Sequence, residues 1–130
     1  MISLNMLSSV LLSCSFPIGV AGTAPEGNFE PFYPDESKET FRLWIETARA
    51  EKIDEQKGNL PLIVMVGEDQ ITFVTPYEEA KYPMFWTIFA ENNDTSKPMH
   101  AIRSIHHKPG PVRSYQYTGT CRMIDDPESD

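Results

Sequence analysis

The most constraining feature of the chain is its opening segment, because no charged side chain occurs between Met1 and Pro25 and the first one is Glu26. The middle of this segment is apolar, and small residues follow the apolar run. Both properties are typical of a secretory leader, although the basic start of such a leader is missing. We therefore predict that residues 1–24 are an export leader and that the fold is built from the residues beyond it.

A short motif within this segment, Leu11-Leu12-Ser13-Cys14, resembles the lipobox of bacterial lipoproteins. In that family a small residue precedes a cysteine, whose thiol receives the lipid and which becomes the new N-terminus. The resemblance implies that Cys14 is a lipidation candidate and that the protein is a membrane-anchored lipoprotein. Residues 25–34 then act as a linker. Without lipidation we expect a periplasmic or secreted protein that does not contact a membrane.

The chain has two cysteines, Cys14 and Cys121, and three outcomes are open for them. Cleavage near Gly22 or Ala24 removes Cys14 and leaves Cys121 as a lone thiol. Lipidation of Cys14 also leaves Cys121 unpaired. Retention of the segment in an oxidising compartment allows the two to form a disulfide. We favour cleavage; if the segment is kept instead, we expect it to form an apolar N-terminal strand in the core.

The residues from 35 to 124 are long enough for one domain, and a helix is expected at their start. Asp35 is a suitable N-cap, and apolar residues follow at the spacing i, i+3, i+4 and i+7. This apolar stripe ends after Ala50, and Gly58 marks the end of the helix. The residues at the helical spacing are Phe41, Trp44, Ile45 and Ala48.

Beyond Gly58 the pattern changes to short apolar and β-branched runs separated by turn residues, which predicts strands. One helix packed on an antiparallel meander of about five strands gives an α+β fold. A small barrel capped by the helix is the second option. Residues 125–130 form an acidic tail. The predicted strands are 62–66, 71–74, 84–90, 99–107 and 112–118.

The net charge of −8 argues against broad binding to nucleic acid. The charge is unevenly distributed, because the stretch from Thr95 to Ile124 contains bases, all three histidines and no acid. We expect these bases to pair with acids of the preceding part of the domain. The functional alternative is a patch for an anionic ligand.

Several catalytic and ligand-binding motifs are missing from the sequence. It contains no Gly-rich phosphate loop, no Cys-x-x-Cys, no His-Glu-x-x-His and no Gly-x-Ser-x-Gly. The histidines also lack the spacing of metal ligands along a strand. We therefore predict no catalytic residue, no metal and no cofactor, and a non-enzymatic protein is favoured.

One group of side chains in the last hairpin could form a binding site. If Pro109-Gly110 closes a two-residue loop, His106 lies opposite Arg113 and Ser104 lies opposite Tyr115. His100 would share a face with His106. Together these imidazole, guanidinium and phenol groups could hold a carboxylate or phosphate. The ligand-binding candidates are His100, His106, Arg113 and Tyr115, although a solvated face is the simpler interpretation.

These observations favour a small exported, non-enzymatic binding or accessory module of the cell envelope or periplasm. Its partner would be a protein or an envelope component. The first alternative is a small enzyme or anion-binding protein that uses the His, Arg and Tyr side chains of the last hairpin. The second is an acidic partner protein of the immunity or antitoxin type, which would require the apolar N-terminal segment to be folded into the core.

Overall fold

The computed structural model describes residues 9–24, 27–34, 38–76, 83–90, 97–107 and 112–127. Within these ranges the chain forms nine strands, and neighbouring strands are antiparallel throughout. A helix long and apolar enough to cross a membrane is not found among these residues. The strands are β1 (Val10–Ala24), β2 (Asn28–Phe32), β3 (Lys38–Trp44), β4 (Arg49–Ile53), β5 (Leu60–Val66), β6 (Gln70–Val74), β7 (Met84–Phe89), β8 (Met99–His107) and β9 (Val112–Asp125).

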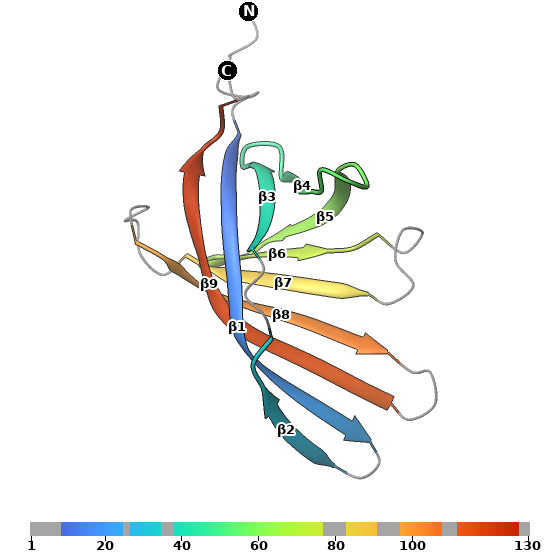
Figure 1. Ribbon diagram of the computed structural model, residues 1–130. Coiled ribbons are helices and arrows are strands. Elements are labelled where there is room, and N and C mark those ends of the chain that lie inside the picture. The colour runs from blue at the N-terminus through green and yellow to red at the C-terminus, as the bar shows by residue number, and fades with distance from the viewer. Residues whose placement is uncertain are drawn as a thin grey trace, which may run out of the picture.

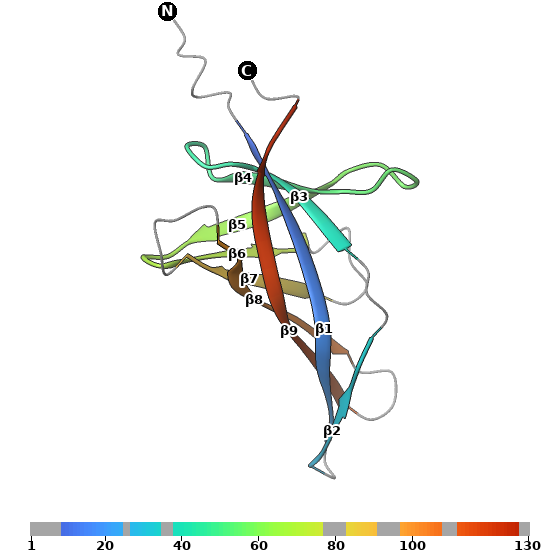
Figure 2. The ribbon, with the colours of Figure 1, turned by 60° about the vertical axis from the view of Figure 1, so that its left-hand side comes forward.

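Eight of the strands close into a barrel, and β2 is an extra strand (Figure 1). Strands β3 to β9 pair in sequence order, and β1 closes the barrel by pairing with both β3 and β9. The second half of β1, from Gly19 to Thr23, pairs with β2 on the edge that its first half shares with β3. Figure 2 shows β2 as an extension beside the lower part of β1. Closure removes the exposed edges that an open sheet would present.

The α+β prediction is wrong, because the residues assigned to an N-terminal helix form β3 and β4. In β3 every second residue is buried, so Phe41 and Leu43 face the core while Arg42 between them does not. The helical spacing joins residues of different elements, since Ile45 lies in the β3–β4 turn and is 55% exposed. Ala48 in the same turn has a φ of 48°, which an α-helix does not allow. The closed barrel is nearer to the second option, but no helix caps it within the described residues.

The five strands expected beyond Gly58 are present as β5 to β9. Their predicted bounds lie within one or two residues of the observed ones, except at the end of β9, which runs on to Asp125. Asp126, in the predicted acidic tail, is buried and pairs with Arg42. The first residues of that tail therefore pack against the barrel.

The segment expected to be an export leader contributes residues 10–24 as β1, which lies between β3 and β9. Leu12 and Phe16 of this strand are buried in the core. Loss of β1 would leave the facing edges of β3 and β9 without a partner. A molecule that has been cleaved near Gly22 or Ala24 therefore lacks β1 and cannot form this barrel. Leader function stays a prediction, and the barrel is the form in which the segment is an apolar strand of the core.

A β-bulge in β1 bends the two longest strands. The pairing of β1 with β9 shifts between Ser15 and Ile18, where Pro17 has no N–H to donate to the ladder. Gly119 of β9 lies at this point, and a Cβ there would lie 1.8 Å from the carbonyl oxygen of Ser15. Only glycine fits against the bulge. Figure 1 shows β1 and β9 curving together along their length.

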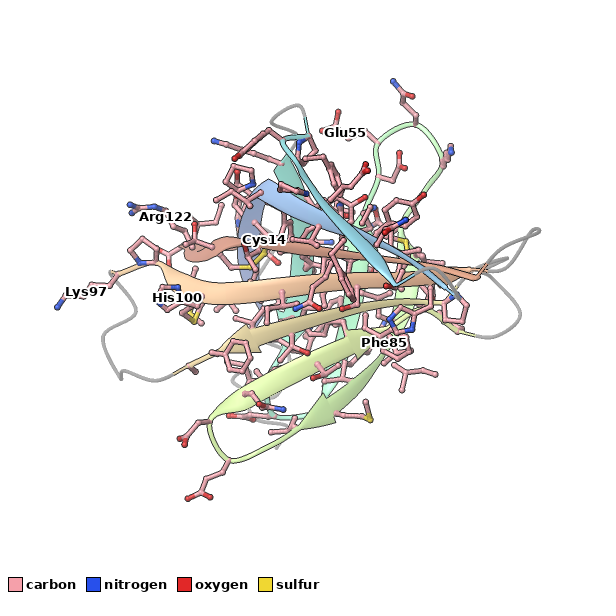
Figure 3. The ribbon with its side chains drawn as sticks, turned by 90° about the horizontal axis from the view of Figure 1, so that it is seen from below. Cys14, Glu55, Phe85, Lys97, His100 and Arg122 are labelled. Carbon is pink, nitrogen blue, oxygen red and sulfur yellow. A yellow bond between two sulfur atoms is a disulfide. The ribbon has the colours of Figure 1, made fainter. Side chains whose placement is uncertain are left out.

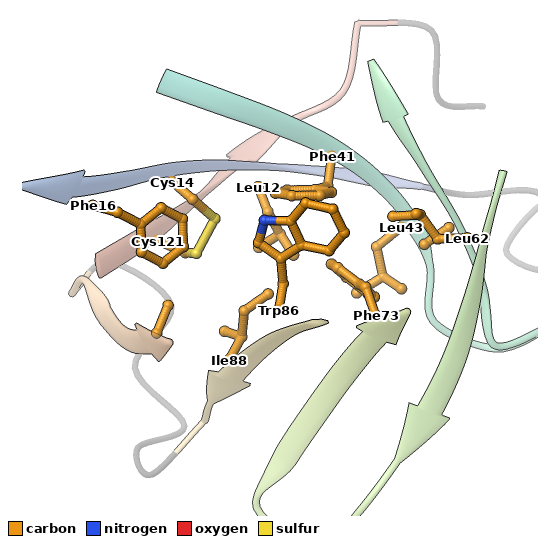
Figure 4. Close-up of a cluster of buried hydrophobic side chains, with 12 residues drawn as sticks. Leu12, Cys14, Phe16, Phe41, Leu43, Leu62, Phe73, Trp86, Ile88 and Cys121 are labelled. Carbon is orange, nitrogen blue, oxygen red and sulfur yellow. A yellow bond between two sulfur atoms is a disulfide. The ribbon is translucent and has the colours of Figure 1, made fainter. Parts of the chain in front are cut away.

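The centre of the barrel is filled with aromatic and aliphatic side chains (Figure 4). Phe41 packs against Phe73 and Trp86, with ring centroids 5.2 and 5.3 Å apart. Because protein interiors are packed to nearly crystalline density, this part of the barrel is a core and not a channel. The buried residues are Leu12, Cys14, Phe16, Phe41, Leu43, Ala50, Leu62, Phe73, Trp86, Ile88, Ala101 and Cys121.

The two cysteines form a disulfide across the β1–β9 seam, where Cys14 and Cys121 are directly paired in the register. This is the third of the outcomes considered above. The bond joins residues 107 positions apart, so in the chain-entropy model it stabilises the fold by about 4–5 kcal/mol. A disulfide of this kind is compatible with an oxidising, exported location.

Candidate functional site

Three charged side chains point toward the inside of the barrel from three strands: Glu39 of β3, Lys52 of β4 and Arg103 of β8. We call them the inner cluster. Strand alternation explains their direction, because Glu39 shares the inner face of β3 with the core residue Phe41. Phe41 in turn pairs with Lys52 in the register. Arg103 pairs with Trp86 on one side and with Tyr117 on the other.

The carboxylate of Glu39 is at the centre of the inner cluster and is 7% exposed. Its Oε2 lies 2.9 Å from Lys52 Nζ, and its Oε1 accepts hydrogen bonds from Arg103 Nη1 and, at 3.3 Å, from Trp86 Nε1. Burial raises the pKa of Glu39, but the positive charges of Arg103 and Lys52 outweigh it, so the pKa lies below the usual 4.5. Glu39 is therefore ionised at neutral pH.

Arg103 is held by aromatic rings but is not fully hydrogen-bonded. Its guanidinium carbon lies 4.0 Å from the ring centre of Tyr117 and 5.3 Å from that of Phe16, both cation–π distances. Its Nε is buried and has no hydrogen-bond partner within the described part of the chain. A buried donor without a partner costs about 1–3 kcal/mol. The inner cluster also holds two bases for one acid, so it carries an excess positive charge.

A cavity of about 500 Å³ opens beside the inner cluster. This volume lies within the range of small-molecule pockets, roughly 300–1,000 Å³. Its rim is formed by the start of β3 and by the turn between β4 and β5, which carries Glu55 (Figure 3). Ile53 is the one apolar residue of the lining among the described residues. The lining residues are Lys38, Glu39, Lys52, Ile53, Asp54, Glu55, Gln56 and Arg103.

A second cavity, of about 250 Å³, lies on the outer face of β1, β2 and β9. Its apolar wall is exposed, with Ile18 at 48% and Phe29 at 74% exposure. It contains no charged side chain among the described residues, so it offers little to fix the orientation of a ligand. The lining residues are Ile18, Val20, Gly22, Phe29, Ser114, Gln116 and Thr118.

The structure does not assemble the site expected in the last hairpin, because the register there differs by one residue. His106 pairs with Ser114, and Tyr115 pairs with Ile105. A slip of one residue turns a side chain to the other face of the sheet, so His106 and Tyr115 point apart. Tyr115 packs against Phe32, with ring centroids 6.2 Å apart, whereas His106 is exposed beside Phe85.

The remaining predicted site residues are not brought together either. His100 is exposed on the face that His106 shares, but it lies six positions away on the same strand. Figure 3 shows it on the outside of the barrel. The side chain of Arg113 lies outside the described residues. Cys14 has its sulfur in the disulfide, so in this form it offers no thiol to a lipid.

The residues of the inner cluster were not among the sequence-based candidates. Glu39 and Lys52 lie within the range predicted as a helix, and neither was singled out as a site residue. Arg103 lies between the apolar residues Ala101 and Ile105, so strand alternation marks it as an inward base. The general expectation that C-terminal bases pair with earlier acids is confirmed for Arg103 and Glu39.

No protein-family model, no curated protein and no solved structure matches this chain significantly. Within the described residues, no group of three or more His, Cys, Asp or Glu side chains is arranged to hold a metal ion. The geometry of the charged cavity therefore carries the functional inference.

Proposed function

We propose that the protein is a small, non-enzymatic binding module of an exported compartment and that its ligand carries an anionic group, a carboxylate or a phosphate. The group binds at the floor of the cavity, between Lys52 and Arg103. It belongs either to a free small molecule or to a component of the cell envelope, because the chemistry of recognition is the same. A nucleic-acid partner is disfavoured by the net charge of −8.

The observation that carries the proposal is the unbalanced inner cluster beside an open cavity. Lys52 and Arg103 both contact one carboxylate, so one positive charge is not neutralised within the inner cluster. The Nε of Arg103 is buried too deeply for a ligand atom to reach it in this structure, so it is not itself the anion contact. An anionic ligand would supply the missing charge beside Lys52 and Arg103, which both line the cavity. Export is supported by the disulfide, and not by the composition of residues 10–24, which the barrel uses as β1.

The proposal is tested by calorimetric titration of the intact, oxidised protein with inorganic phosphate and with acetate at constant ionic strength. The substitution Lys52→Gln removes the excess charge and leaves Glu39 and Arg103 as a one-to-one pair. A hydrogen bond to a charged group contributes about 1.5–3 kcal/mol, so we expect affinity to fall at least about tenfold.

The matched control is Arg122→Gln, which removes one positive charge from an exposed position of β9 outside the cavity lining. We expect its affinity for both anions to stay within about twofold of the unsubstituted protein, because distant exposed charges are screened. If neither anion binds, or if both substitutions weaken binding equally, the cavity is not an anion site.

A further inference from the structure

The floor and the rim of the cavity carry opposite charge. At the floor, Lys52 and Arg103 exceed Glu39 by one positive charge. At the rim, Asp54 and Glu55 exceed Lys38 by one negative charge. The named lining is thus neutral as a whole, and its two rim acids come from the turn after β4, where two backbone N–H hydrogen bonds and, to a lesser extent, the nearby positive charge of Lys52 lower the pKa of Asp54.

The acidic side of the rim is held in place by its own hydrogen bonds. The Oδ1 of Asp54 accepts from the backbone N–H groups of Gln56 at 2.9 Å and Lys57 at 3.0 Å. The backbone N–H of Gly58, which has a φ of 84°, donates to the carbonyl oxygen of Asp54. The side chain of Asn59 then links the turn to Glu51 of β4. This turn fixes the Asp54 carboxylate before any ligand arrives, which lowers the entropic cost of binding.

We propose that the ligand of the cavity is a small zwitterion, whose anionic group binds Lys52 and Arg103 at the floor and whose ammonium group faces Asp54 and Glu55 at the rim. This inference rests on the proposed function, since it adds a second recognition element to the anion site. The chemical class is that of amino acids, ω-amino carboxylates and very short peptides.

The same charges disfavour other classes of ligand. A dicarboxylate would bring its second carboxylate next to Asp54 and Glu55, and such like-charge contacts reduce affinity. A lipid-like ligand would find little apolar surface, because Ile53 is the one apolar side chain among the described lining residues. It would also bury charged groups of the lining without giving them a partner. Specificity is thus set by repulsion as well as by attraction.

The test is a calorimetric comparison of three series of compounds on the oxidised protein. The first series is the ω-amino carboxylates from glycine to 6-aminohexanoate. The second is the simple carboxylates of the same chain lengths, and the third is the corresponding dicarboxylates. We expect the best ω-amino carboxylate to bind about threefold to fivefold more tightly than its matched simple carboxylate, which is the upper part of the range that a partly exposed ion pair supplies. The dicarboxylates should bind most weakly.

The substitution Glu55→Gln locates the effect at the rim. It should remove most of the advantage of the ω-amino carboxylates and leave the affinity for simple carboxylates unchanged or slightly raised. Glu68→Gln is the matched control, because Glu68 is an exposed acid in the β5–β6 turn, at the other end of β5. It should change neither series.

The outcomes separate this inference from the proposed function. If simple carboxylates bind as tightly as the ω-amino carboxylates and Glu55→Gln changes nothing, the cavity is an anion site and the zwitterion inference fails. If no series binds, the proposed function fails with it. If Glu55→Gln and Glu68→Gln weaken ω-amino carboxylates equally, the rim is not the source of the preference and the inference also fails.

Discussion

Two charged clusters share strands β3 and β4 but lie on opposite faces of them. They differ in how completely their polar atoms are hydrogen-bonded. The inner cluster is Glu39, Lys52 and Arg103. The outer cluster is Arg42 of β3, Glu51 of β4 and Asp126 beyond β9. Arg42 Nη1 lies 2.8 Å from Glu51 and Arg42 Nε lies 2.6 Å from Asp126. Arg42 and Glu51 are paired in the register and point away from the core.

The comparison separates a structural role from a binding role for similar side chains. In the outer cluster the Nε of the arginine is bonded, and Ser9 also donates to Asp126, so residues from both ends of the described chain are joined to the barrel. In the inner cluster the Nε of Arg103 has no hydrogen-bond partner among the described residues, and the cluster lines a cavity. Buried polar groups that lack a hydrogen-bond partner often occur at functional sites. We therefore assign stability to the outer cluster and binding to the inner one.

The largest effect on stability is expected from Arg42→Ala. The side chain of Asp126 is fully buried, and loss of Arg42 would remove a base that lies 2.6 Å from its carboxylate. Breaking a buried pair in this way costs about 3–5 kcal/mol. Urea unfolding of the oxidised protein measures the loss. Phosphate affinity, measured in the folded range, should not change, and a large fall in it would remove the distinction between the two clusters.

A smaller effect on stability is expected from Glu39→Gln. The amide keeps the shape of the side chain and an acceptor for Trp86, but Lys52 and Arg103 lose their countercharge, so we expect a loss of about 1–3 kcal/mol. The floor would then carry two positive charges, and affinity for phosphate should rise. Urea unfolding and calorimetry test the two parts. A fall in phosphate affinity would mean that Glu39 itself forms the binding surface.

The pH dependence of stability should follow Glu39. Its pKa in the folded protein lies below the usual 4.5, so the unfolded chain binds its proton more readily. The stabilisation from Glu39 is therefore fully present above pH 4.5 and is lost as the pH falls through the lower folded-state pKa. Urea midpoints between pH 3 and pH 7 should fall less steeply on acidification for Glu39→Gln than for the unsubstituted protein. Parallel curves for the two proteins would contradict this.

The smallest change in stability is expected from Lys52→Gln, the variant with the largest expected effect on binding. The Lys52 side chain is 30% exposed, and partly exposed ion pairs contribute about 0–1 kcal/mol. Urea unfolding should show a loss within this range while phosphate binding falls at least about tenfold. A loss of stability comparable to that of Arg42→Ala would show that the inner cluster is also structural.

The sequence allowed the strands from Leu60 onward to be predicted, because their signals are local. Apolar runs of strand length alternate there with turn residues such as Gly67. The fold of the N-terminal half was predicted wrongly for two reasons. A strand, a turn and a second strand placed apolar residues such as Phe41 and Ile45 at helical spacing by coincidence. The uncharged composition of β1 reflects a strand between two neighbours and also matches that of a leader.

The site was beyond reach from the sequence because its parts come from three strands. Glu39 and Lys52 meet on the β3–β4 hairpin, but Arg103 of β8 joins them only when the barrel closes, and closure depends on long-range pairing that no local pattern encodes. The last hairpin shows the same limit, since one residue in the length of its connection decides whether His106 and Tyr115 share a face. A charged residue at an inward position of a predicted strand, such as Arg103, was the sequence signal that could have revealed the site.

The most direct measurement of the central claim is the side-chain Nε–H resonance of Arg103 in a proton–nitrogen correlation spectrum during titration with phosphate at constant ionic strength. An anion bound beside the guanidinium would change the magnetic environment of this proton. We expect a saturable shift of the Arg103 resonance with the same apparent affinity as calorimetry, and a much smaller shift for Arg122. An Arg103 resonance that stays in place while phosphate binds would contradict the assignment of the cavity as the anion site.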